Sequence, residues 1–144
     1  MGQDREEGTR RRVTARGRLL LWAPVALVLG YEFFLSAQPP SGMPDLGPWF
    51  WEKDKVEHAV YFFLTGLLAV RAARFGEGWS RGKTAVFLIL VGLLWGCSDE
   101  IHQSFTPGRD VEIGDVLADT AGVALAVALG ERILSKVGLG RVVR

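Results

Sequence analysis

Two short polar runs carry the residues that could do chemistry, and the first is DKVEHAVY at 54–61. Asp54, His58 and either Tyr61 or Phe62 recur at helical spacing, so these side chains would share one face of a helix. Asp54 would lie at the start of that helix, where a carboxylate opposes the positive end of the helix dipole. An imidazole near carboxylates is suited to proton transfer, so His58 is a candidate acid or base.

The second run is SDEIHQSFTPGRDVEIGDVLADTAG at 98–122, and it joins acids, an amide and a guanidinium. Its candidate residues are Asp99, Glu100, Gln103, Arg109, Asp115 and Asp119. A Thr-Pro-Gly sequence before Arg109 predicts a tight turn. The guanidinium of Arg109 would hold a phosphate or carboxylate by two hydrogen bonds, or it would neutralise neighbouring aspartates such as Asp99 or Asp115. Both interpretations stay open.

Four apolar segments must position these residues, at about 19–37, 54–75, 83–103 and 115–136. Each approaches the ~20 residues that cross a ~30 Å hydrocarbon layer. The charge-free cores of the middle two would also suit buried helices of a soluble protein, but four such segments in succession favour a membrane. A signal peptide is the alternative for the first segment, although no small-residue cleavage site follows it.

We therefore predict an all-α fold, a transmembrane four-helix bundle. A basic tail would occupy residues 1–18, the bundle 19–136, and a C-terminal tail 137–144. The loop at 38–51 is rich in proline and aromatic residues, which suits the headgroup layer of a membrane. A Gly-x-x-x-Gly pair, Gly92 and Gly96, permits close helix contact, either within the bundle or in a homodimer.

The distribution of charge predicts the orientation of the bundle. The termini and the middle loop hold 14 of the 17 lysines and arginines, and the first and third loops hold only 3. Both termini should therefore be cytoplasmic. Acidic residues show the opposite bias, with 11 of 16 on the outer side. Acids contribute little to topology, so we interpret their bias as functional.

This topology brings residues from separate parts of the sequence to one outer face. The first and third segments end there, whereas the second and fourth begin there. The converging residues are Glu32, Asp54, Lys55, His58, Asp99, Glu100, Gln103, Arg109, Asp115 and Asp119. An ionisable group inside a span is costly unless it is paired or hydrated, so these residues predict a shared polar site. Asp99 is one expected partner of His58.

The polar motifs resemble the VanZ-like family of small bacterial integral membrane proteins, over roughly 34–130. They are Ser36-x-Gln38-Pro39, Asp54-Lys55-x-x-His58-x-x-x-Phe62, Asp99-Glu100-x-x-Gln103, Pro107-Gly108-Arg109 and Asp115-x-x-x-Asp119-x-x-Gly122. The family pattern more often has Asn where this chain has Asp119. The resemblance implies a multi-pass protein of the bacterial cytoplasmic membrane with a role at the cell envelope, in resistance to teicoplanin-type glycopeptides.

Two classes of function remain open. In the first, the outer site binds a cell-wall precursor, a lipid-linked ligand or a partner, and lowers the access of a glycopeptide to its target. In the second, the protein is a membrane enzyme for a lipid-linked or phosphate-bearing substrate. His58 would then be the acid or base, Asp54 or Asp99 its orienting carboxylate, and Arg109 the anion clamp. No nucleophile stands out, which favours the first class.

The sequence also bounds cofactors and partners. Oxygen ligands of the second run would suit a divalent cation, but clustered carboxylates are weak evidence for one, and no metal ligand is assigned. The single cysteine, Cys97, excludes an intramolecular disulfide. A nucleic-acid partner is not expected, because the basic tail is short and precedes a membrane span.

Overall fold

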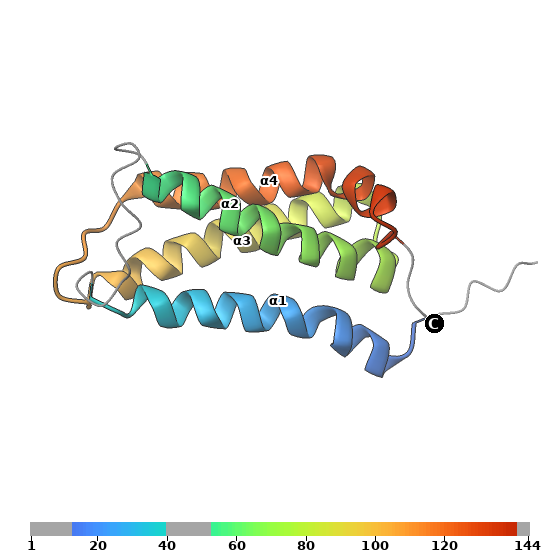
Figure 1. Ribbon diagram of the computed structural model, residues 1–144, viewed down its shortest axis with the longest axis horizontal. Helices are drawn as coiled ribbons and strands as arrows, with labels where there is room; N and C mark the ends of the chain where they lie inside the picture. The colour runs from blue at the N-terminus through green and yellow to red at the C-terminus, as the bar shows by residue number, and fades with distance from the viewer. Residues whose placement is uncertain (1–12, 40–52, 141–144) are drawn as a thin grey trace, which may run out of the picture.

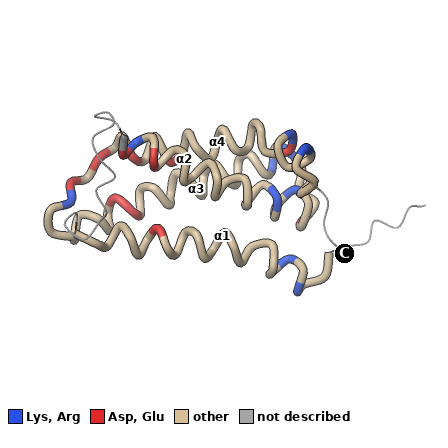
Figure 2. The backbone as a smooth tube through the Cα atoms, viewed as in Figure 1, with Lys and Arg blue, Asp and Glu red and all other residues tan. Residues whose placement is uncertain are grey.

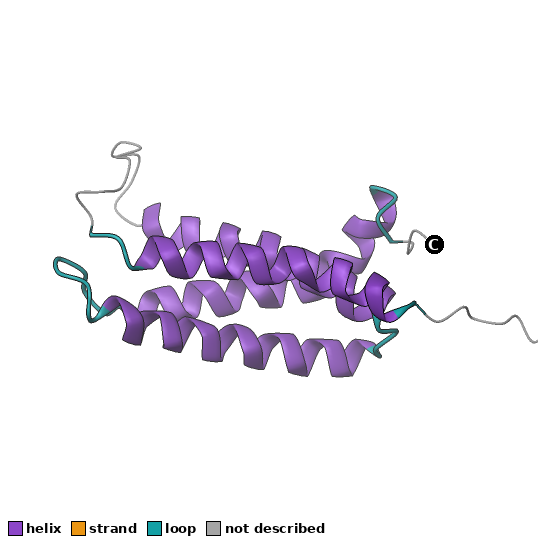
Figure 3. Ribbon diagram, turned by 90° about the horizontal axis from the view of Figure 1, so that it is seen from below, coloured by secondary structure: helices purple, strands orange, loops and turns teal. Residues whose placement is uncertain are grey.

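The computed structural model describes residues 13–39 and 53–140, and four long helices form this part of the chain. They are α1 (Ala15–Ser36), α2 (Lys53–Val70), α3 (Arg81–Gln103) and α4 (Ile113–Lys136). A π-helix, η2 (Arg71–Gly76), continues α2. The described residues contain no strand, and the helices lie side by side along one long axis (Figures 1 and 3).

Side-chain caps determine where two of the helices begin. The hydroxyl of Thr14 accepts a hydrogen bond from the backbone N–H of Gly17 at 3.1 Å, so α1 begins at Ala15, ahead of the predicted Leu19. Ser80 accepts in the same way from Lys83 at 3.2 Å, and α3 begins at Arg81. Such caps satisfy N–H groups that have no partner within the helix. Arg16 and Arg18 therefore lie in the first turn of α1.

Small residues bring α2 and α4 into the closest contact of the bundle. A Cβ atom on Gly122 of α4 would collide with the carbonyl oxygen of Ala59 on α2, so the two backbones touch there. One turn later, a Cβ on Gly66 would lie 2.7 Å from the Cβ of Ala126. In a membrane no hydrophobic effect drives helices together, so close packing of small residues holds them in contact.

The predicted glycine pair of α3 also faces a neighbour within the bundle. A Cβ on Gly92 would lie 2.9 Å from Val123, and one on Gly96 would lie 3.0 Å from a carboxylate oxygen of Asp119. Close helix contact at this pair is confirmed as contact between α3 and α4. Pairing of two chains stays a prediction.

The bundle buries polar groups and exposes apolar ones, the reverse of a soluble domain. Asp99 and Asp119 are each only 1% exposed. Large apolar side chains cover the outside of all four helices, among them Leu20, Leu27, Leu64, Leu94 and Leu117. All four helices are long and apolar enough to cross a membrane. The predicted fold class, an all-α transmembrane four-helix bundle, is therefore confirmed.

Opposite charges occupy opposite ends of the bundle (Figure 2). The start of α1 and the end of α4 lie at the end where lysines and arginines gather, together with η2 and the start of α3. Most carboxylates lie at the other end, which we call the acidic end, with the start of α2 and the end of α3. A cytoplasmic location of the basic end stays a prediction from the charge bias.

Candidate functional site

A cavity of about 360 Å³ opens at the acidic end of the bundle. Side chains from α1, α2, α3 and the loop after α3 line it: Glu32, Leu35, Ser36, Asp54, Glu57, His58, Tyr61, Phe62, Gln103 and Arg109. The four helix ends that the sequence predicted to converge do meet here. Among the residues predicted to converge, five line the cavity itself: Glu32, Asp54, His58, Gln103 and Arg109.

His58 is held by a carboxylate from a different helix. Its Nδ1 lies 2.9 Å from Oδ1 of Asp119, on α4. Gly96 of α3 leaves room for the other oxygen of Asp119, because a Cβ there would lie only 3.0 Å away. The sequence had proposed Asp99 or Asp54 in this role. The structure corrects that assignment, because tight packing at Gly122 brings the start of α2 against α4.

Asp99 instead forms a buried bond within α3. Its Oδ2 accepts a hydrogen bond from Nε2 of Gln103 at 2.6 Å, while Oδ1 is buried and makes no hydrogen bond within the described residues. Asp99 thereby fixes the amide of Gln103, which lines the cavity. A buried oxygen without a partner is costly, so this position is suited to a hydrogen-bond donor brought by water or by a ligand.

A third buried carboxylate comes from α1. Glu32 accepts a hydrogen bond at 2.9 Å from the indole N–H of Trp95, on α3. It also interacts electrostatically with Asp99 and Asp119. Three carboxyl groups thus gather at this side of the cavity, and His58 is the basic group hydrogen-bonded to Asp119. This side of the cavity is therefore suited to groups that donate hydrogen bonds.

Lys55 lies among three carboxylates near the starts of α2 and α4, one of which, Asp54, also lines the cavity. Its Nζ lies 2.6 Å from Glu112, 3.3 Å from Asp54 and 3.4 Å from Asp115. One oxygen from each of these three carboxylates lies within 4.8 Å of the others. Three such oxygens would suit a divalent cation, but the ammonium group of Lys55 already lies beside all three. The arrangement therefore works as an ion-pair network that joins α2 to the start of α4.

The loop after α3 is held at two points. Glu100 accepts a hydrogen bond from the backbone N–H of Glu112 at 2.6 Å, which fixes the approach to α4. Arg109 donates from Nε to the carbonyl oxygen of Gln38 at 3.2 Å, which ties the loop to the end of α1. Glu100 thus shapes the loop without lining the cavity, while Arg109 lines it.

Comparison with known protein families identifies a match for this chain. The family model described as VanZ/LLP1 matches residues 9–134, most of the chain. The chain belongs to the VanZ/LLP1 family. No curated protein and no solved structure matches it.

The predicted family is thus confirmed. The structure shows where most of the predicted motifs of this VanZ/LLP1 protein lie. Motif residues of α2, α3, α4 and the loop at 104–112 meet at the acidic end. The Ser36 and Gln38 motif also ends there, although its Pro39 is the last residue described before the gap at 40–52. The aromatic residues predicted to lie in the headgroup layer, 49–51, fall outside the described residues.

Several side chains at the acidic end of this VanZ/LLP1 protein have contacts that the sequence did not predict. Trp95 was not predicted as the partner of Glu32, although a carboxylate within a span requires a donor. Glu57 was also not predicted to line the cavity. Tyr61 lies at the predicted helical spacing, and its hydroxyl donates a hydrogen bond to the carbonyl oxygen of Val28, which ties α2 to α1. The contacts of Trp95 and Tyr61 could not be predicted from sequence spacing, because each joins helices that are distant in sequence.

Proposed function

We propose that this VanZ/LLP1 protein acts at the cell envelope, in the bacterial cytoplasmic membrane, and lowers the access of teicoplanin-type glycopeptides to their cell-wall targets. The observation that carries the proposal is the polar cavity that His58, Gln103 and Arg109 share at the acidic end. The charge bias predicts that this end faces away from the cytoplasm. A cavity placed there would meet cell-wall precursors at the membrane surface.

The groups around the cavity favour a ligand of mixed chemistry. Arg109 offers N–H donors that suit a phosphate or carboxylate. Glu32 and Asp54 offer oxygens that accept hydrogen bonds from hydroxyl, amide or ammonium groups. A lipid-linked cell-wall precursor combines a phosphate with such donors, so this ligand class matches both kinds of group. A precursor held in this way would be less accessible to the drug.

The test compares teicoplanin susceptibility in a glycopeptide-sensitive host that carries each variant at matched membrane levels. His58→Ala and Arg109→Ala change the lining of the cavity. Asp110→Asn is the control, because Asp110 is exposed on the same loop and does not line the cavity. We expect wild type and Asp110→Asn to protect and the other two variants to fail. Absence of protection by wild type, or equal protection by all four proteins, would contradict the proposal.

The bond between His58 and Asp119 favours a second candidate, an enzyme for a lipid-linked or phosphate-bearing substrate. Asp119 would orient the imidazole through Nδ1, which leaves Nε2 to move a proton to or from a substrate. Arg109 would hold the anionic group. The described residues show no nucleophile with a base partner, so the chemistry would use His58 as an acid or base alone.

Replacement of His58 by Asn separates the two candidates. Asparagine retains hydrogen bonding but cannot transfer a proton near neutral pH. If the site only binds its ligand, the His58→Asn protein should still give the host much of its protection against teicoplanin. Teicoplanin susceptibility is measured beside that of a host with His58→Ala. Loss of protection as complete as in His58→Ala, at equal membrane levels, would favour the enzyme.

A further inference from the structure

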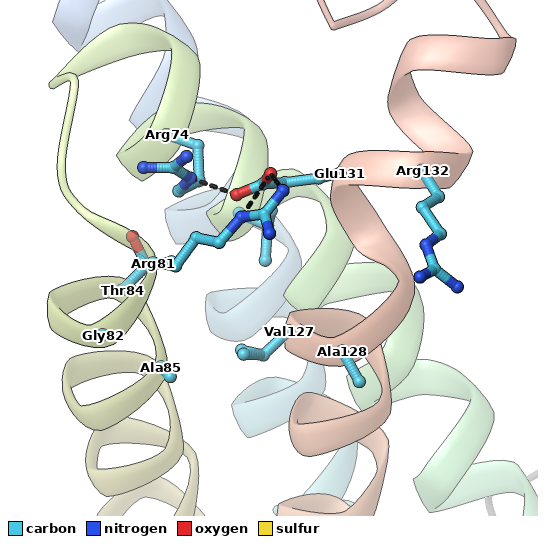
Figure 4. Close-up of a pocket in the computed structure, with 10 residues that line it drawn as sticks. Arg74, Arg81, Gly82, Thr84, Ala85, Val127, Ala128, Glu131 and Arg132 are labelled. Atoms are coloured by element: carbon cyan, nitrogen blue, oxygen red, sulfur yellow. Dashed lines mark hydrogen bonds and ion pairs between the residues drawn. The ribbon is translucent and has the colours of Figure 1, made fainter.

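A second cavity, of about 370 Å³, lies at the basic end of the bundle, where the proposed function has no role for it (Figure 4). It lies between α3 and α4, next to the junction of α2 and η2. Its lining consists of Val70, Arg74, Arg81, Gly82, Thr84, Ala85, Val127, Ala128, Glu131 and Arg132. We call it the arginine pocket.

The charges of the arginine pocket are unbalanced. Three arginines share it with one carboxylate, Glu131. Arg81 donates to one oxygen of Glu131 from Nε at 3.0 Å and from Nη2 at 2.8 Å. Arg74 donates from Nε to the other oxygen. Arg132 lies apart from these three in Figure 4, and no described residue forms an ion pair with it. The lining residues therefore carry an excess of two positive charges, one of them on Arg132, whose guanidinium points away from the Arg81–Glu131 pair in Figure 4.

The positions of the arginines are set by the backbone around them. The wide turns of η2 carry Arg74, whose Nη1 donates to the carbonyl oxygen of Trp79 in the loop before α3. A π-helical turn of this kind often marks a functional site. The guanidinium of Arg81 has five N–H donors, of which two bond to Glu131. The others remain available to a ligand. The side chain of Arg81 is 82% exposed.

The start of α3 adds a favourable field and open space. The first turn of a helix presents N–H groups at the positive end of the helix dipole, which favours an anion. Gly82 lies in that turn, and a Cβ placed on it would meet no atom within 4 Å. An anion in the pocket thus meets both the arginines and the positive end of the α3 dipole.

The remaining walls are small and apolar. Ala85 of α3 and Val127 and Ala128 of α4 continue the pocket from the arginines towards the middle of the bundle. Ala128 is exposed, so this strip faces outwards, where lipid surrounds the bundle. A charged head beside the arginines would therefore be continuous with an apolar chain beside the alanines.

Aromatic residues indicate the depth of the pocket in the membrane. Trp79 packs edge-on against Phe87 with ring centroids 5.0 Å apart, and Nζ of Lys83 lies 4.2 Å from the centroid of Trp79. Tryptophan and lysine together are typical of the headgroup layer. The arginine pocket therefore lies at the level of lipid phosphates.

We propose that the arginine pocket binds the phosphate of an anionic phospholipid, whose acyl chain lies along the groove between α3 and α4. The excess positive charge selects an anionic lipid over a zwitterionic one. Glu131 is the only carboxylate among the described residues that line the pocket, and it already accepts from two arginines. No acid of this lining is therefore left for an ammonium headgroup. This lipid site is separate from the cavity at the acidic end.

The test uses the purified full-length protein in a neutral detergent. Binding of phosphatidylglycerol and of phosphatidylcholine with the same acyl chains is measured by native mass spectrometry. Three variants are compared with wild type: Arg81→Gln with Arg132→Gln, Ala128→Phe, and Arg71→Gln. The double variant retains the Arg74–Glu131 pair. Arg71 lies at the same end but donates to the carbonyl oxygen of Leu139 and does not line the pocket, so its variant is the matched control.

Wild type and Arg71→Gln should bind phosphatidylglycerol about tenfold more tightly than phosphatidylcholine, and the double variant should lose that preference. Ala128→Phe fills the groove without a change of charge and should weaken both lipids. This variant keeps the proposal testable if the double variant does not fold. Equal binding of the two lipids by wild type, or an unchanged preference in the double variant, would overturn the proposal. Displacement of the lipid by inorganic phosphate at equal concentration would instead assign the pocket to free phosphate and would overturn it too.

Discussion

Nδ1 of His58 and Oδ1 of Asp119 lie 2.9 Å apart, although α2 and α4 place them 61 residues apart in sequence. The pair lies where the two helices are in closest contact, beside the touching backbones of Ala59 and Gly122. A polar side chain on one helix is therefore oriented by the packing of small residues on another. The site and the fold depend on the same helix interface.

Asp119→Asn should retain the function of the site. The asparagine carbonyl accepts the hydrogen bond of Nδ1 as the carboxylate does. Asp119→Leu removes the acceptor from a buried position and should cost about 1–3 kcal/mol of stability. Protection against teicoplanin and thermal unfolding in detergent are measured for both variants. If Asp119→Asn were as inactive as Asp119→Leu, the negative charge of Asp119 would be required.

Gly122→Ala should destabilise the bundle by about 1–3 kcal/mol, because its Cβ would collide with the carbonyl oxygen of Ala59. Gly30→Ala is the matched control, since a Cβ at Gly30 meets no atom within 4 Å. Thermal unfolding of both proteins in the same detergent gives the comparison. Equal unfolding temperatures would mean that α2 and α4 are not in backbone contact.

Trp95→Phe should destabilise the protein, because the indole N–H is the donor to the buried carboxylate of Glu32. The expected cost is about 1–3 kcal/mol for the unpaired acceptor, in addition to the lost ring volume. Addition of Glu32→Gln replaces the buried carboxyl group by a neutral amide and should restore part of the stability. Thermal unfolding of the single and double variants measures this coupling. Purely additive effects would argue against the bond.

Lys55→Gln should give the protein an affinity for divalent cations that wild type lacks. The change removes the ammonium group from the carboxylates of Asp54, Glu112 and Asp115, and leaves three oxygens that suit Mg²⁺ or Ca²⁺. The unfolding temperature should then rise with added Ca²⁺ in the variant and stay constant in wild type. A similar rise in wild type would show that Lys55 does not exclude the ion.

Much of the architecture could be predicted from the sequence, because span length and charge bias are local properties. The four helices and the meeting of Asp54, His58, Gln103 and Arg109 at one end followed from them. The partner of His58 did not, since Asp99 and Asp119 both lie at a suitable depth. Only the packing at Gly122 decides between α3 and α4.

The arrangement of the arginines at the basic end could not be predicted from the sequence either. In the sequence, Arg74, Arg81 and Arg132 count only among the positive charges beside membrane spans. The π-helical turn at η2 and the shared carboxylate of Glu131 bring two of them together. No motif signals this arrangement, because its members come from three separate helices.

The most direct test of the proposed role measures labelled teicoplanin at the surface of glycopeptide-sensitive cells. Cells that carry wild type, Arg109→Ala or Asp110→Asn are compared at equal protein levels in the membrane. We predict that wild type and Asp110→Asn reduce the amount of bound drug and that Arg109→Ala leaves it at the level of cells without the protein. An equal amount of bound drug in all these cells would contradict the account, because the polar cavity would then have no effect on glycopeptide access.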